Sequence, residues 1–127
     1  TDFASFLKLL PGTLDGRTLR HAVEGRSPSF VPPEVVTMAR DHNVAIVTAK
    51  DEAFPEIDER TADFTYARFM ATSDDLAEGV SKTELTALGK QARAWAEGGD
   101  VFAYFISGAK VRNPAAAQAL IKLLAKG

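Results

Sequence analysis

The segment Val44–Ala49 is the feature that most restricts the fold of this chain, because it reads Val-Ala-Ile-Val-Thr-Ala without a charged residue. A short apolar run rich in β-branched residues predicts a strand. The lack of alternation with polar residues predicts that both faces of this strand are buried, as in a parallel sheet covered by helices. The segment therefore predicts an α/β fold.

Strands and helices alternate along the rest of the chain. Further strands are predicted at 19–26, 63–69 and 101–106. Helices are predicted at about 2–10 and 33–42, from the cap Ser81 to the stop at Gly98-Gly99, and from Pro114 through Leu124. Local signals mark the helix ends: Pro33 suits a first turn, Asn43 accepts the conformation that ends a helix, Ser81 with Glu84 forms a capping box, and Asn113 precedes Pro114. Residues 50–62 are predicted to form a loop long enough for a parallel crossover.

This order predicts a parallel sheet with right-handed crossovers and flanking helices. The pattern alone leaves two architectures open, a four-stranded open α/β sheet and part of a TIM-type barrel. A whole barrel takes about 250 residues, whereas this chain has 127, a length that favours one domain.

Composition excludes several classes of protein. Apolar residues make up 46% and charged residues 25% of the chain, which is typical of a globular protein and not of a disordered one. The net charge of -2 disfavours a polybasic nucleic-acid or membrane-surface module. Without cysteine the chain has no disulfide or thiolate metal site, which fits a cytoplasmic location. No apolar run is long enough for a membrane span, and no motif predicts a cofactor.

Charged residues gather at the carboxyl ends of the predicted strands, where barrel enzymes place their sites. They are Glu24, Arg26, Lys50, Arg68, Lys110 and Arg112. Alternation puts Glu24 and Arg26 on one face of their strand, together with Arg20. Charges on a buried sheet are costly unless they are paired or solvated.

Two interpretations of these charges stay open. In the first, Glu24 acts as a base or orienting group among cations, with Arg26 and Arg68 as further catalytic residues that hold an anion. In the second, Glu24 forms an internal ion pair with Arg26 or Arg68 that closes the end of the barrel.

The loop between the last strand and the last helix is a candidate phosphate-binding site. Backbone N–H groups and the positive end of a helix dipole can hold a phosphate there. The candidate ligands are Ser107, Gly108, Lys110, Arg112 and Asn113. The spacing of a P-loop is missing, and an ordinary βα loop with a helix cap is the simpler interpretation.

Histidines and aromatic residues give weaker signals. His21 and His42 are the only histidines, and their spacing does not predict a metal site. Tyr66, Phe102 and Tyr104 are predicted to be core or barrel-lining residues rather than stacking platforms.

Four segments resemble the YecE-like family, a domain of unknown function. They are His21–Phe30, with the sequence His-Ala-Val-Glu-Gly-Arg-Ser-Pro-Ser-Phe; Ala45–Val47 with Ala49 and Pro55; Thr61–Arg68, with Thr-Ala-Asp-Phe-Thr-Tyr-Ala-Arg; and Asp100–Asn113. Ser27 and Met70-Ala71 depart from the family, which often has His and His-Gly there. The resemblance implies a TIM-type barrel about twice this length, with this chain as its C-terminal half, strands five to eight. It implies no particular reaction.

The sequence leaves three functions in competition. The first is an enzyme or binding protein for a small anionic or phosphorylated ligand at the carboxyl ends of the strands. The second is binding of nucleic-acid phosphates by the same cluster, with phosphodiester chemistry, which the net charge disfavours. The third is a non-catalytic structural or interaction protein in which the charges are ion pairs.

Overall fold

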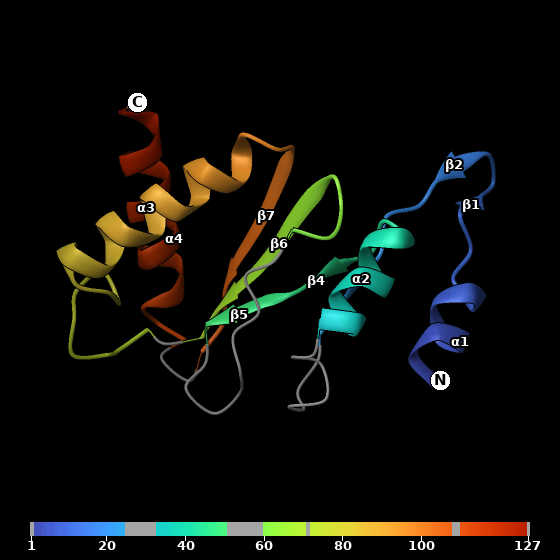
Figure 1. Ribbon diagram of the computed structural model, residues 1–127. Coiled ribbons are helices and arrows are strands. Elements are labelled where there is room, and N and C mark those ends of the chain that lie inside the picture. The colour runs from blue at the N-terminus through green and yellow to red at the C-terminus, as the bar shows by residue number, and fades with distance from the viewer. Residues whose placement is uncertain (1, 25–32, 51–59, 71, 108–109, 127) are drawn as a thin grey trace.

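The computed structural model describes residues 2–24, 33–50, 60–70, 72–107 and 110–126 (Figure 1). Its helices are α1 (Asp2–Leu9), α2 (Pro33–Asp41), α3 (Lys82–Ala96) and α4 (Asn113–Ala125). Its strands are β1 (Thr13–Leu14), β2 (Arg17–Thr18), β3 (Ala22–Val23), β4 (Ala45–Ile46), β5 (Thr48–Lys50), β6 (Phe64–Phe69) and β7 (Asp100–Phe105).

The strands that follow the first hairpin pair in parallel and in sequence order. β3 pairs with β4, β5 pairs with β6, and β6 pairs with β7 over its whole length. Val47 alone separates β4 from β5, and its N–H donates to the carbonyl of Val23 at 2.8 Å. β4 and β5 are thus successive parts of the strand predicted at 44–49. The parallel α/β architecture is confirmed, and the described strands do not close into a barrel.

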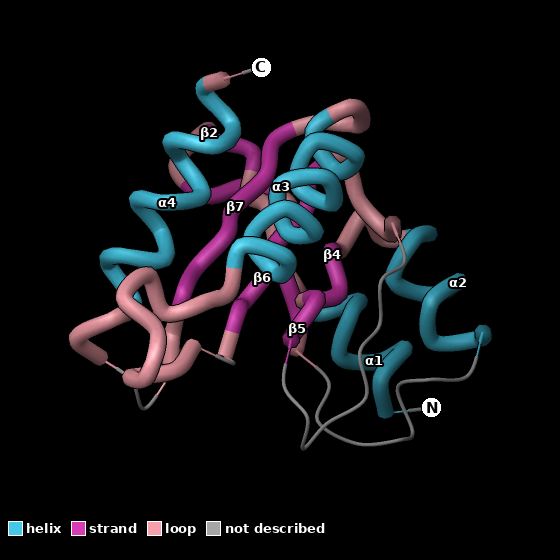
Figure 2. The backbone as a smooth tube through the Cα atoms, turned by 90° about the vertical axis from the view of Figure 1, so that its left-hand side faces the viewer, coloured by secondary structure: helices cyan, strands magenta, loops and turns pink. Residues whose placement is uncertain are grey.

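Helices cover one face of these strands, which we call the outer face. On it, Val23 and Ile46 pack against Val35, Val36 and Ala39 of α2. Further along, Ala67 and Phe69 pack against Leu120 of α4 and Trp95 of α3, and α3 and α4 lie over the strands in Figure 2. Residues Val44–Thr48 are all buried, as predicted from their composition.

Local sequence signals set the element ends where the structure describes them. Asn43 has a φ of 53°, the left-handed conformation expected after α2. The Ser81 side chain accepts a hydrogen bond from the N–H of Glu84 at 3.1 Å, so it caps α3 as predicted. Pro33 is the first residue of α2, where its missing N–H costs nothing.

Three details differ from the prediction. Within the described residues the strand predicted at 19–26 shortens to β3, because the N–H of Leu19 bonds to Gly12 and extends the preceding hairpin. That hairpin, β1–β2, was not predicted; Asp15 and Gly16 turn it with φ angles of 52° and 78°. Asn113 begins α4 instead of capping it, and its side chain bonds to Ser107.

Candidate functional site

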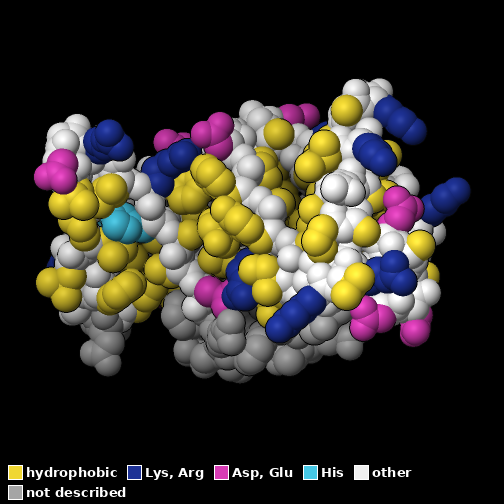
Figure 3. All heavy atoms as spheres, turned by 180° about the vertical axis from the view of Figure 1, so that it is seen from behind, with side chains coloured by type: hydrophobic (Ala, Val, Ile, Leu, Met, Phe, Trp, Pro, Cys, Tyr) yellow, Lys and Arg dark blue, Asp and Glu magenta, His cyan; other side chains and the backbone are white. Residues whose placement is uncertain are grey.

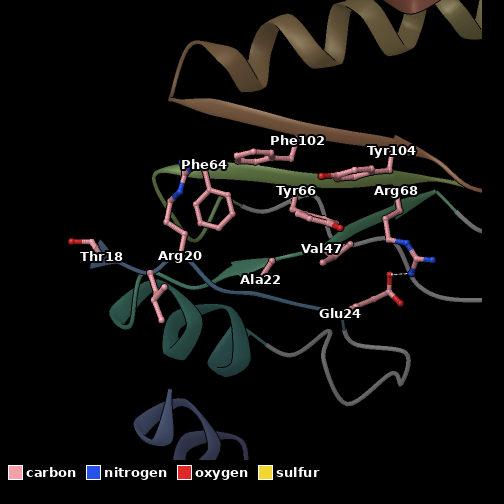
Figure 4. A pocket seen from close by; sticks show the side chains of 11 residues that line it. Thr18, Arg20, Ala22, Glu24, Val47, Phe64, Tyr66, Arg68, Phe102 and Tyr104 are labelled. Carbon is pink, nitrogen blue, oxygen red and sulfur yellow. Dashed lines mark hydrogen bonds and ion pairs between the residues drawn. The ribbon is translucent and has the colours of Figure 1, made fainter. Parts of the chain in front are cut away.

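A pocket of about 660 Å³ lies against the face of the sheet opposite the helices, which we call the inner face (Figure 4). Side chains two residues apart on a strand share a face, so even-numbered positions of β3, β6 and β7 line it. The lining residues are Thr18, Leu19, Arg20, Ala22, Glu24, Val47, Phe64, Tyr66, Arg68, Phe102 and Tyr104.

An ion pair between Glu24 and Arg68 occupies the carboxyl end of this pocket. The Nη1 of Arg68 donates to Oε1 of Glu24 at 2.5 Å. Glu24 directly follows β3, and Arg68 is the last but one residue of β6, so two strands bring them together at the edge predicted for the site. Their side chains are only 21% exposed for Arg68 and 18% for Glu24, so the pair is largely shielded from water.

Arg20 occupies the amino end of the pocket. Its guanidinium carbon lies 5.2 Å from the ring centre of Phe64 and 5.0 Å from that of Phe102. It also forms an ion pair with Asp100 at 3.0 Å. The alternation of side chains along the strand predicted at 19–26 placed Arg20 on the same face as Glu24. The sequence did not predict a partner for Arg20. Both ends of the pocket thus have an arginine paired with a carboxylate, and Arg20 contacts two phenyl rings in addition.

Two tyrosines form the middle of the pocket. The rings of Tyr66 and Tyr104 lie 5.1 Å apart between centres, tilted by 30°. Tyr104 is opposite Arg68 in the register of β6 and β7 and is 43% exposed. Figure 4 shows the hydroxyl of Tyr66 directed toward the Glu24–Arg68 pair. Both residues line the pocket, as predicted.

The described part of the loop predicted to bind phosphate does not line the inner-face pocket. Thr72 Oγ1 lies 2.6 Å from Oδ1 of Asn113, and Ser107 Oγ lies 3.0 Å from the same oxygen. The two hydroxyl groups also contact each other, so one of them donates to the other, which in turn donates to Asn113. The guanidinium of Arg112 donates to the carbonyls of Asp74 and Ala77, both at 3.4 Å. These groups therefore tie the 72–80 segment to the start of α4.

The structure does not bring all the predicted site residues together. Lys110 is exposed and does not line the pocket of Glu24 and Arg68. Neither do Ser107, Arg112 or Asn113. Arg26 and Gly108, as well as the side chain of Lys50, lie outside the described residues.

Neither histidine lines the pocket. The Nε2 of His21 lies 2.8 Å from the carbonyl oxygen of Pro11, which fits the structural role predicted for it. In the described ranges, no three His, Asp or Glu side chains gather closely enough to ligate a metal ion.

Viewed from behind, the molecule has hydrophobic side chains gathered across its middle, with basic and acidic groups around them (Figure 3). Tyr104 and Ile106, at the end of β7, are among the exposed large hydrophobic residues.

Comparison with known proteins identifies the family. The model of the DUF72 family, described as a protein of unknown function, matches residues 1–127. The chain belongs to the DUF72 family. YecE-like is another name for this family, so the resemblance seen in the sequence is confirmed.

Solved structures of DUF72 family proteins share the fold. One from Enterococcus faecalis V583 is 15% identical, with a TM-score of 0.68 over 84% of this chain and 49% of that one. Another, from Thermotoga maritima MSB8, is 22% identical, with a TM-score of 0.64 over 86% of this chain and 47% of that one. This chain therefore spans about half the length of these two proteins.

Two further comparisons complete the description. No curated protein matches the chain significantly. None of the helices in the described part of the chain is both long and apolar enough to traverse a membrane.

Proposed function

We propose that this chain is the C-terminal half of a TIM-type barrel and that the carboxyl end of its inner-face pocket binds a small anionic or phosphorylated ligand. Parallel strands in sequence order support the first part, because consecutive strands of a barrel pair in this way. The match to about half of each solved relative supports it further. In a barrel, the inner face would line the interior and Glu24 and Arg68 would stand at its mouth.

The observation that carries the ligand proposal is the position of Arg68. Within the described residues, its guanidinium uses Nη1 for Glu24, and no hydrogen bond of its Nε or Nη2 is found. Arginine has five N–H donors in a planar fork that matches a carboxylate or phosphate. Glu24 fixes the orientation of the fork, and the remaining donors are then able to hold an anion at the mouth of the pocket.

The proposed site takes Glu24, Arg68 and Arg26, two positions after Glu24 in the sequence, as its charged groups, with Glu24 as the base if the site is catalytic. The Ser107–Asn113 loop stays a separate prediction for phosphate binding. Its hydroxyl and amide groups already bond to Thr72, so a phosphate there would have to rely on the backbone N–H groups, Lys110 and those donors of Arg112 that do not bond to Asp74 and Ala77.

Titration of the purified protein with inorganic phosphate, followed by calorimetry or NMR, tests the proposal. Arg68→Gln should weaken phosphate binding by about tenfold or more, the loss of one charge-assisted contact. Arg17→Gln is the matched control, because Arg17 is an exposed residue of β2 that does not line the pocket. Equal binding by the wild type and Arg68→Gln would exclude this site.

The two competing functions give different results in the same experiment. A structural ion pair predicts no phosphate binding, together with a loss of about 1–3 kcal/mol in the free energy of unfolding for Glu24→Gln, between the values for exposed and buried pairs. Nucleic-acid binding predicts that a short oligonucleotide binds more tightly than phosphate and that its affinity falls steeply with salt.

A further inference from the structure

We infer that the ligand of this pocket is a sugar ring that carries an acidic group, such as a sugar phosphate or a sugar acid. This inference rests on the proposed function, because it uses Arg68 as the anion-binding group. It adds the chemistry of the rest of the ligand, which the Glu24–Arg68 pair alone does not define.

The exposed tyrosine ring beside Arg68 calls for a ligand with an apolar face. Tyr104 is 43% exposed although it lies in a strand, and it is opposite Arg68 in the register of β6 and β7. Tyr66 supports it from the side, with ring centres 5.1 Å apart. A group held by Arg68 therefore places the rest of its molecule against an aromatic surface. The C–H groups on one face of a sugar ring pack well on such a surface.

Polar groups around the same surface call for hydroxyl groups on that ring. Among the described residues, no hydrogen bond is found for the hydroxyl of Tyr66 or that of Tyr104. Both hydroxyls belong to residues that line the pocket; Tyr104 is 43% exposed, and the oxygen of Tyr66 is not buried without a partner. They are thus accessible to a ligand, and each is able both to donate and to accept.

The carboxylate of Glu24 strengthens this requirement. It lies 2.5 Å from the Nη1 of Arg68, so a second anion on Arg68 is also close to a negative charge. A carboxylate repels an anion but accepts hydrogen bonds from hydroxyl groups. A ligand whose hydroxyl groups face Glu24 while its acidic group faces the free side of Arg68 avoids this repulsion. A simple hydrophobic acid offers no hydrogen-bonding group to the tyrosine hydroxyls.

The pocket is large enough for such a ligand. Its volume of about 660 Å³ falls within the range of ordinary small-molecule sites. At the amino end, Arg20 is already held by Asp100 and two phenyl rings. The acidic group is therefore expected at the Arg68 end, with the sugar ring toward the tyrosines.

Calorimetric titration with three probes tests this inference: inorganic phosphate, glucose 6-phosphate and sorbitol 6-phosphate. The last has the phosphate and hydroxyl groups of the sugar without its ring. We expect glucose 6-phosphate to bind at least about tenfold more tightly than either other probe. Tyr104→Phe and Tyr66→Phe keep the rings and should each weaken glucose 6-phosphate by about three- to tenfold, the value of one hydrogen bond. They should leave inorganic phosphate unchanged.

The outcomes separate this inference from the proposed function. If all three probes bind equally and Arg68→Gln weakens them all, the anion site stands and the sugar inference is wrong. Tighter binding of glucose 6-phosphate that neither Tyr→Phe variant reduces also overturns the inference, because the sugar is then bound elsewhere. If no probe binds, the proposed function itself fails. Titration with glucuronate shows whether a carboxylate replaces the phosphate.

Discussion

Arg20 shows how a single side chain closes one end of the inner-face pocket. It has two kinds of partner, the rings of Phe64 and Phe102 and the carboxylate of Asp100. The carboxylate is 72% exposed, so water screens its attraction to Arg20. The ring of Phe64 is buried and that of Phe102 is partly buried, and contact of a cation with a ring face is worth about 0.5–2 kcal/mol. The stability that Arg20 contributes should therefore come mainly from the rings.

Substitutions of Arg20 and of Asp100 test whether the rings or the ion pair contribute more to stability. Arg20→Gln should lower the free energy of unfolding by about 1–2 kcal/mol, whereas Asp100→Asn should lower it by less than about 0.5 kcal/mol. Urea denaturation followed by circular dichroism measures both. Equal losses for the two variants would show that the ion pair, and not the aromatic contact, is the main interaction.

The sequence could predict individual site residues only in part. Alternation along the first strand put Arg20 and Glu24 on one face, and the inner-face pocket has both. Glu24–Arg68 was one of two ion pairs that the sequence allowed; the other partner, Arg26, lies outside the described residues. Pairing of residues 44 positions apart depends on strand order and register, which no local pattern contains. Lys110 follows its strand after a turn, where alternation no longer predicts direction, and it lies outside the pocket.

At the scale of elements, the turn between α3 and β7 fixes where β7 starts against β6. Gly99 has a φ of 140°, and a Cβ built on it would collide with the carbonyl oxygen of Asp63. That oxygen belongs to the backbone just before β6, so it cannot move without shifting the strand. The close approach therefore requires glycine at this position.

Gly99→Ala should lower the free energy of unfolding by about 2–4 kcal/mol, through backbone strain and the collision with Asp63. Gly12→Ala is the control, because a Cβ there meets no atom within 4 Å. It should cause no loss of stability. Thermal or urea unfolding distinguishes the two, and a Gly99→Ala variant as stable as Gly12→Ala would contradict the role of this turn.

The ends of elements that have local sequence signals could be predicted. The ends of strands that depend on pairing with a neighbouring strand were harder to predict. Ser81 and Asn43 act within their own helix ends, so α2 and α3 came out close to their predicted bounds. β3 depends on hydrogen bonds to β4, and within the described residues it is shorter than its pattern implied. The β1–β2 hairpin did have a local signal, the pair Asp15-Gly16, which favours a tight turn with positive φ at both residues. Its strands of two residues are too short to show alternation.

At the scale of the whole molecule, the edge of β7 that does not pair with β6 is the surface that we most expect to contact another chain. In the described part of the chain, β7 pairs only with β6. Beside it, a groove of about 450 Å³ runs between the strand and helices α3 and α4, with an apolar lining that includes Val101, Phe105 and Leu120. Ile121, which also lines this groove, is 66% exposed. An unpaired strand next to an apolar groove is a typical site of association.

If the chain is half of a barrel, the other half pairs with this edge and covers the inner face except at the mouth of the barrel. The 127-residue chain produced alone should then dimerise, aggregate or bind a hydrophobic dye. Size-exclusion chromatography with light scattering and dye fluorescence measure these properties. Ile121→Lys puts a charge into the groove and should shift the chain toward the monomer, because a charged group is costly to bury in an apolar interface. Ala87→Lys, at an exposed position of α3 outside the groove, is the control and should leave association unchanged. A strictly monomeric chain with a sharp thermal transition and no dye binding would show that these strands need no further partner, and the half-barrel proposal would then be wrong.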